Sequence, residues 1–124
     1  MNEIALLFAA FFGATAVILG AFGAHLLNRK LTAEQLKSFE TGVKYQIYHA
    51  IVLLVLGFQL KESTPMNKYI FLALIIGTVL FSFSIYGLVI SSARNKKIRF
   101  LGPITPIGGV FLLIGWGLLL CTFM

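Results

Sequence analysis

An uncharged apolar run near the start of the chain constrains its fold more than any other feature. The run extends from Ile4 to Leu27 and contains no Lys, Arg, Asp or Glu. As an α-helix rising ~1.5 Å per residue, it is longer than the ~30 Å hydrocarbon core of a bilayer. A cleaved signal peptide has a basic start and a shorter apolar core, whereas Glu3 precedes this run. We therefore predict a retained membrane-spanning helix.

The composition of the whole chain agrees with a membrane protein. Of its 124 residues, 59% are hydrophobic and 11% are charged, and the mean hydropathy is +0.95. Soluble domains of this size carry roughly a quarter charged residues. The net charge of +6 does not indicate nucleic-acid binding, because the basic residues form short clusters between apolar runs, as in membrane proteins. A single cysteine, Cys121, excludes an intrachain disulfide.

Three further apolar runs follow the first, and they predict three more spans. The four spans are expected at about residues 4–27, 45–60, 69–92 and 106–124. Thr105 as N-cap and Pro106 at the first helical position would begin the last span. We predict an all-α fold, a four-helix transmembrane bundle that forms a single membrane domain of residues 1–124.

The polar segment before the second span carries helix signals of its own. Thr32 and Gln35 have the spacing of a capping box, which predicts that a helix begins there. Apolar residues then recur at helical spacing opposite charged ones, at Leu36, Phe39 and Val43. We expect a short amphipathic helix on the membrane surface, with a bend at Gly42 before the second span.

The distribution of basic residues predicts the orientation of the spans. Eight of the ten Lys and Arg residues lie between spans one and two or between spans three and four, whereas Lys61 and Lys68 flank the remaining turn. Cytoplasmic loops of membrane proteins are enriched in Lys and Arg. Both termini are therefore expected on the non-cytoplasmic side.

With this orientation, most polar residues of the spans fall in the cytoplasmic leaflet. Thr41, Tyr45, Tyr48 and His49 share one helix face, and Thr78, Ser82 and Tyr86 share another. Polar groups within hydrocarbon need partners, so we expect both faces to point inward and form a polar pocket. The candidate functional residues are His25, Glu40, Tyr45, Gln46, Tyr48, His49, Ser82, Tyr86 and Thr105.

The candidates leave several function classes open. His25 and His49 lie at similar depth and could ligate haem iron or another metal, although the chain has no Cys-x-x-Cys-His sequence. His49 could also move protons, because an imidazole titrates near neutral pH. An enzyme needs a nucleophile with a base or paired carboxylates, and Glu40 and His49 lie about 13 Å apart along one helix. We expect no enzyme, no cofactor and no metal.

Four ordered motifs carry a resemblance to a known family. They are Gly20–His25, Thr41–His49, Leu80–Tyr86 and Leu101–Gly109, the last followed by Gly115 and Trp116. They resemble the YgdD/YwdK-like family of small bacterial membrane proteins, a domain of unknown function with mitochondrial relatives in animals. The resemblance implies a four-span protein of the bacterial inner membrane and supplies no activity or catalytic residue to transfer. The family pattern usually has glycine where this chain has Phe83, so span three is expected to pack differently here.

The expectation for function is a non-enzymatic structural or interaction protein. It would bind membrane lipids or a protein partner through the inner-leaflet pocket. A homo-oligomer stays open, because small residues four apart, such as Ala9 and Gly13, let helices approach closely. The alternatives are a small channel or proton-coupled transporter that uses His49, and a haem- or quinone-linked redox protein that uses His25 and His49.

Overall fold

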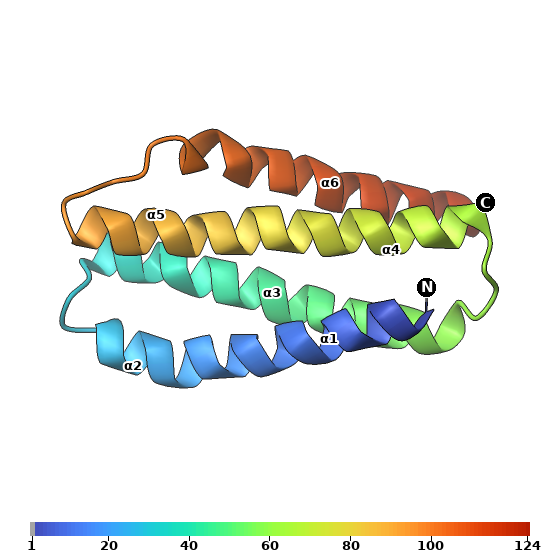
Figure 1. Ribbon diagram of the computed structural model, residues 1–124, viewed down its shortest axis with the longest axis horizontal. Helices are drawn as coiled ribbons and strands as arrows, with labels where there is room; N and C mark the ends of the chain where they lie inside the picture. The colour runs from blue at the N-terminus through green and yellow to red at the C-terminus, as the bar shows by residue number, and fades with distance from the viewer. Residues whose placement is uncertain (1) are drawn as a thin grey trace.

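Four long antiparallel helical segments make up the molecule (Figure 1). The computed structural model describes residues 2–124, apart from the side chain of Ala24. Over these residues four helical segments are long and apolar enough to cross a membrane, which confirms the four-span prediction. In chain order the elements are α1 (Asn2–Val17), the π-helix η1 (Ile18–Gly23), α2 (Ala24–Leu27), α3 (Ala33–Gln59), α4 (Pro65–Thr78), the π-helix η2 (Val79–Phe83), α5 (Ser84–Ala93) and α6 (Leu101–Thr122).

Helix α3 begins at the predicted capping box and continues without a break. The hydroxyl of Thr32 accepts from the Gln35 backbone N–H at 3.1 Å, and the Gln35 side chain accepts from the Thr32 N–H at 3.0 Å. The predicted bend at Gly42 is wrong, because this glycine serves close packing: a Cβ there would lie 2.8 Å from Cε1 of Tyr86. A separate interfacial helix is not shown, since its residues form the first turns of α3.

Helix α6 begins at Leu101, so the predicted cap at Thr105 is also wrong. A turn with backbone bonds from Leu101 to Ile98 and from Gly102 to Arg99 leads directly into the helix. Pro106 therefore lies inside α6, where its missing N–H costs the helix one hydrogen bond. Thr105 instead faces α5 and shares a 2.6 Å hydrogen bond with the Ser84 hydroxyl.

The helices pack as two antiparallel pairs joined through their inner members. α1 packs along α3, α4 packs along α6, and α5 contacts both α3 and α6. Figure 1 shows this order across the molecule and places both termini at the same end. Phe83, which occupies the position of the family's glycine, fills the space between α1 and α5: its ring centroid lies 6.4 Å from that of Phe12 and 5.8 Å from that of Tyr86.

Two apolar clusters form the core. The larger one combines side chains of α1, α3, α4 and α6, including the fully buried Phe12, Leu53 and Phe71. The smaller one, centred on Phe39 and Tyr86, lies nearer the α2–α3 and α5–α6 loops. Between the two clusters along α3 lies Gln46, whose side chain is also fully buried.

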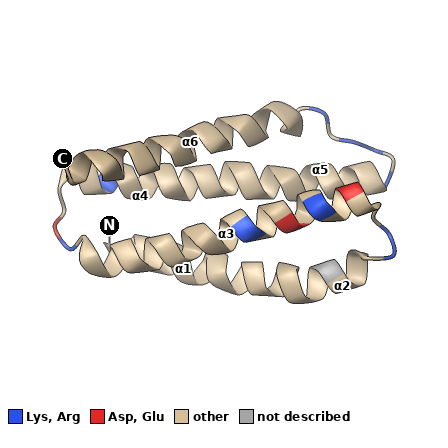
Figure 2. Ribbon diagram, turned by 180° about the vertical axis from the view of Figure 1, so that it is seen from behind, with Lys and Arg blue, Asp and Glu red and all other residues tan. Residues whose placement is uncertain are grey.

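Charged residues gather at one end of the molecule. Figure 2 shows Lys and Arg in the α2–α3 and α5–α6 loops, together with alternating charges on the first half of α3. We call this the basic end. The opposite end carries Lys61 and Lys68 beside the α3–α4 turn. The two loops that the sequence predicted to share one membrane face therefore do lie at the same end of the bundle.

Candidate functional site

A set of buried hydrogen bonds, which we call the polar layer, crosses the middle of the bundle. It consists of Thr15, Gln46, Ser82 and Tyr86. The Gln46 amide nitrogen donates to the Phe12 carbonyl at 2.9 Å and to the Thr15 hydroxyl at 2.6 Å. The Gln46 amide oxygen accepts from the Tyr86 hydroxyl at 2.6 Å. One glutamine on α3 thus links α1 to α5.

The rest of the polar layer is equally well satisfied. The Ser82 hydroxyl donates to the Gly42 carbonyl at 2.8 Å. Throughout the described residues, no buried side-chain nitrogen or oxygen lacks a hydrogen-bond partner. A fully satisfied buried network makes a core rigid. These bonds tie α3 to α1, η2 and α5.

Both ring nitrogens of His49 are engaged. Nδ1 lies 2.7 Å from the Tyr45 carbonyl, and Nε2 accepts from the indole N–H of Trp116 at 3.1 Å. An indole nitrogen can only donate, so this geometry assigns a neutral imidazole with its hydrogen on Nδ1. The bond joins α3 to α6. The Nε2 lone pair that a metal would need is already occupied by the Trp116 donor.

The other residues of the predicted pocket are more exposed. His25 and Glu40 are exposed, and Tyr45 and Tyr48 are 42% and 53% exposed. The Tyr45 ring nevertheless packs against Phe81 of η2, at 5.0 Å between ring centroids. The buried face of α3 instead carries Phe39, Gly42, Gln46 and His49.

The predicted inward face of α3 is thus partly wrong, and the reason lies in packing. The Phe39 ring lies tilted against the Tyr86 ring at 5.3 Å between centroids, and the missing side chain of Gly42 leaves room for the same tyrosine. These contacts fix the rotation of α3 about its axis. Tyr45 and Tyr48 remain partly exposed, and a bilayer interface accepts tyrosine readily. On the third segment, Thr78, Ser82 and Tyr86 are all buried, as their shared face predicted.

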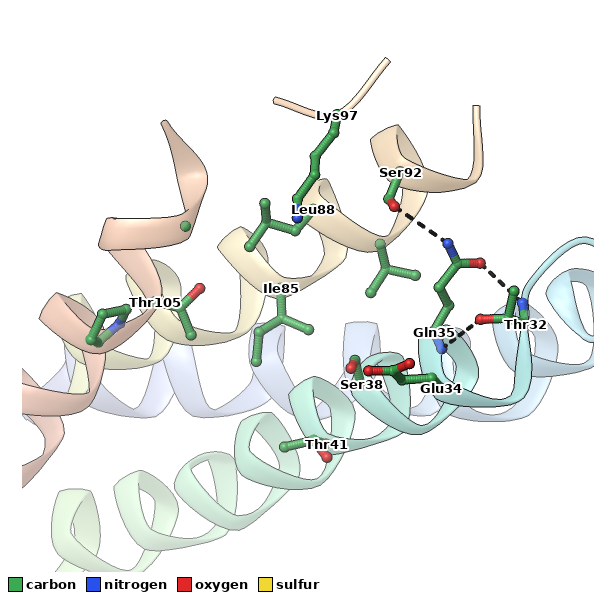
Figure 3. Close-up of a pocket in the computed structure, with 13 residues that line it drawn as sticks. Thr32, Glu34, Gln35, Ser38, Thr41, Ile85, Leu88, Ser92, Lys97 and Thr105 are labelled. Atoms are coloured by element: carbon green, nitrogen blue, oxygen red, sulfur yellow. Dashed lines mark hydrogen bonds between the residues drawn. The ribbon is translucent and has the colours of Figure 1, made fainter. Parts of the chain in front are cut away.

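A different set of residues lines an open pocket at the basic end, which we call the groove. It has a volume of about 650 Å³, within the ~300–1,000 Å³ typical of ligand sites. It lies between the first turns of α3, the last turns of α5 and the start of α6 (Figure 3). Its lining residues are Thr32, Glu34, Gln35, Ser38, Thr41, Ile85, Leu88, Val89, Ser92, Lys97, Gly102, Thr105 and Pro106.

The walls of the groove are tied together by side-chain hydrogen bonds. The Gln35 side chain donates to the Ser92 hydroxyl at 3.3 Å and so joins α3 to α5 (Figure 3). The bond between Ser84 and Thr105 joins α5 to α6. The groove is therefore formed by the packing of three helices, whose side chains hold one another by hydrogen bonds.

Lys97 is held over the groove by the loop that follows α5. This helix ends in a Schellman motif: Asn95 takes a left-handed conformation with φ 60°, and the Lys96 N–H donates to the Ser91 carbonyl at 2.9 Å. On the other side of Lys97, the Ile98 N–H donates to the Ser91 hydroxyl at 3.1 Å. Figure 3 shows the Lys97 side chain extending toward Leu88.

The groove is amphipathic. Its α3 wall presents the polar side chains of Glu34, Ser38 and Thr41, whereas its α5 floor presents Ile85 and Leu88. Glu34 and Lys97 are its charged lining residues. Within residues 2–124, no group of three or more His, Cys, Asp or Glu side chains could hold a metal ion. This arrangement is suited to binding an amphiphilic molecule.

Of the nine candidates chosen from sequence, Thr105 alone is a groove residue. Glu34 and Ser38 are absent from the candidates, because they lie in a segment whose pattern is typical of an amphipathic surface helix. Lys97 is absent because its basic loop, although suited to lipid headgroups, was interpreted mainly as a topology signal. A signal for them did exist. The capping box at Thr32 and the basic loop at Lys97 were both assigned to the same membrane face, so they could have been paired as neighbours.

Comparison with known proteins identifies relatives along nearly the whole chain. Residues 19–109 match the family described as "Protein of unknown function (DUF423)". The UPF0382 inner membrane protein YgdD of Escherichia coli K12 is 41% identical over 122 residues, which cover 96% of this chain and 88% of that protein. A UPF0382 membrane protein of Staphylococcus saprophyticus is 42% identical over 102 residues, covering 82% of this chain and 80% of that protein.

No solved structure matches this chain. The sequence relatives nevertheless cover well over two thirds of its length, and the four apolar helices agree with the membrane location in their names. The chain is a multi-pass inner-membrane protein, and it belongs to the DUF423/UPF0382 family of membrane proteins of unknown function.

Proposed function

We propose that the protein is a non-enzymatic membrane protein that binds a lipid in the groove. The observation that carries this proposal is the groove itself, a 650 Å³ space with a polar wall facing an apolar floor. A lipid has the matching division between a polar headgroup and an apolar tail. The buried polar groups elsewhere offer less support for a ligand, because the protein itself satisfies them.

The depth of the groove supports a lipid with its headgroup toward the loops. Thr32 and Thr41 lie nine residues apart on α3, so the polar wall extends ~13 Å along the helix axis. This length reaches from the level of the basic loops into the outer part of a ~30 Å hydrocarbon core. The headgroup would lie beside Lys97 and Glu34, and the acyl chain would follow Leu88 and Ile85.

The proposed orientation places the groove in the cytoplasmic leaflet and both termini on the opposite side. It rests on the eight basic residues that accompany the α2–α3 and α5–α6 loops, against two beside the α3–α4 turn. Cysteine accessibility in intact cells tests this orientation. The native Cys121 is exposed and is first replaced by serine. In that background Asn95→Cys would react only after the membrane is opened, and Ser63→Cys would react before.

Transport through His49 and haem ligation have weaker support. His49 bonds to Tyr45 and Trp116, so protonation or metal binding at Nε2 would break the contact between α3 and α6. His25 lies exposed on α2 and adds no second ligand beside it.

Filling the groove tests the lipid site directly. Ser38 is exposed and lines the groove, so Ser38→Trp should occupy the space without disturbing the core. Ala33→Trp is the matched control, because Ala33 is exposed on the same helix outside the groove. After purification in mild detergent, native mass spectrometry should show a bound lipid on the wild type and the control but not on Ser38→Trp. Equal lipid retention in both variants would refute the site.

A further inference from the structure

The charges of the groove carry an inference about the headgroup, which rests on the proposed lipid site. We infer that the groove selects a zwitterionic phospholipid whose headgroup ends in a primary ammonium group. The lining residues include one carboxylate, Glu34, and one ammonium, Lys97. They come from different elements, α3 and the α5–α6 loop, so the groove presents opposite charges on two walls (Figure 3).

Lys97 is placed to contact the phosphate. Its side chain extends from the hydrogen-bonded loop toward Leu88 on the apolar floor. A lysine ammonium binds phosphate oxygens with charge-assisted hydrogen bonds. This contact alone would accept any phospholipid, so it does not explain a choice among headgroups.

Glu34 would provide the selectivity among headgroups. Its carboxylate can accept hydrogen bonds from a primary ammonium, which carries three N–H donors. Ser38 follows one helical turn later on the same face and adds a hydroxyl acceptor. The Thr41 hydroxyl already donates its hydrogen to the Lys37 carbonyl at 3.0 Å, so it can only accept a hydrogen bond from a ligand.

The same carboxylate disfavours the other common headgroups. An anionic phosphoglycerol headgroup ends in a neutral glycerol, so it would bring no cation to Glu34 and would leave the charge of the lipid phosphate uncompensated within the headgroup. A trimethylammonium headgroup carries a positive charge but no N–H donor for Glu34 and Ser38. Rejection by an unmatched charge is a usual source of specificity. The other loop cations, Arg94, Lys96 and Arg99, lie outside the groove lining and attract anionic lipids without selecting among them.

The experiment measures lipid choice by the full-length protein. The protein is equilibrated in vesicles of equal parts phosphatidylethanolamine, phosphatidylglycerol and phosphatidylcholine, extracted in mild detergent and analysed by native mass spectrometry. Glu34→Gln and Lys97→Gln remove the two groove charges. Glu40→Gln and Lys96→Gln are the matched controls, because both residues are exposed, carry the same charges and lie outside the groove lining.

The wild type and both controls should retain phosphatidylethanolamine in preference to the other two lipids. Glu34→Gln should lower that preference by about two- to fivefold, the range of an exposed ion pair, and Lys97→Gln should weaken retention of all three lipids. If Glu34→Gln keeps the wild-type preference while Ser38→Trp still expels lipid, the headgroup inference is wrong and the lipid site stands. If Ser38→Trp retains lipid as well as Ala33→Trp does, the site itself is wrong.

Discussion

The polar layer and the groove use similar side chains on one helix, yet their surroundings differ. In the polar layer, Gln46 is fully buried and bonds to α1 and α5 through both ends of its amide. In the groove, Glu34 and Ser38 are exposed and face an open space of about 650 Å³. The difference shows that polarity within a membrane bundle does not by itself mark a binding site. The useful question is whether the protein already satisfies the group.

Stability should be most sensitive to substitutions in the close-packed middle of the bundle. A Cβ on Gly108 would overlap the backbone of Leu80 and Phe81 in η2, whereas a Cβ on Gly109 would make an ordinary 3.9 Å contact. Gly108→Ala should therefore lower the free energy of unfolding in detergent by about 2–3 kcal/mol. Gly109→Ala should be neutral or slightly stabilising.

A substitution at Gly102 applies the same test to the groove, which this residue lines. A Cβ on Gly102 meets nothing within 4 Å, although this residue lies on the same helix as Gly108. Gly102→Ala should leave the melting temperature near that of the wild type. Equal loss in the Gly102 and Gly108 variants would mean that α6 is packed equally along its length and would contradict the distinction.

The polar layer should respond to the loss of its central amide. Gln46→Leu leaves the Tyr86 hydroxyl without its acceptor in a buried site. We expect a loss of about 2 kcal/mol in unfolding free energy, near the upper range for membrane hydrogen bonds. Gln59→Leu is the control, because Gln59 is exposed at the end of α3.

Tyr86→Phe should rescue part of this loss. With both partners removed, no buried donor remains without an acceptor, so the double variant should be more stable than the sum of the two single changes. Additive losses, measured by thermal unfolding of all three variants, would show that Gln46 and Tyr86 do not act as a pair.

Loss of the hydrogen bond between His49 and Trp116 should lower the unfolding free energy less than loss of the Gln46 amide, and it should also change the tryptophan fluorescence. Trp116 is the one tryptophan of the chain, so its fluorescence reports this contact. His49→Phe should lower stability by about 1 kcal/mol and change the Trp116 emission. His25→Phe should change neither quantity, because His25 is exposed on another segment. Unchanged emission in His49→Phe would contradict the contact between α3 and α6.

Substitutions in the groove should change the stability of the protein least. Ser38→Trp adds a large side chain to an exposed position that faces open space. Its unfolding free energy should stay within about 0.5 kcal/mol of the wild type, even though bound lipid is lost. A strong loss of stability would show that the groove is packed space and would remove the contrast with the polar layer.

The sequence predicted the positions of the helices better than the way in which the helices pack against one another. Long apolar runs and the capping box are local signals, so four spans and the start of α3 at Thr32 were correct. The rotation of α3 depends on how Phe39 and Gly42 meet Tyr86, some forty residues away. Helical periodicity alone therefore placed His49 correctly but also turned Tyr45 and Tyr48 inward. Lys97 and Glu34 approach one groove only after two loops meet at the basic end.

Photocrosslinking of a lipid in the membrane tests the central claim most directly. A phosphatidylethanolamine with a photoactivatable group near its headgroup is incorporated with the wild-type protein into vesicles, and the labelled residues are mapped by peptide mass spectrometry. The account predicts adducts on the groove walls, in residues 32–41 of α3 and 85–92 of α5, that Ser38→Trp abolishes and Ala33→Trp preserves. Adducts spread evenly over the outer faces of α1 and α6, unchanged by Ser38→Trp, would contradict it.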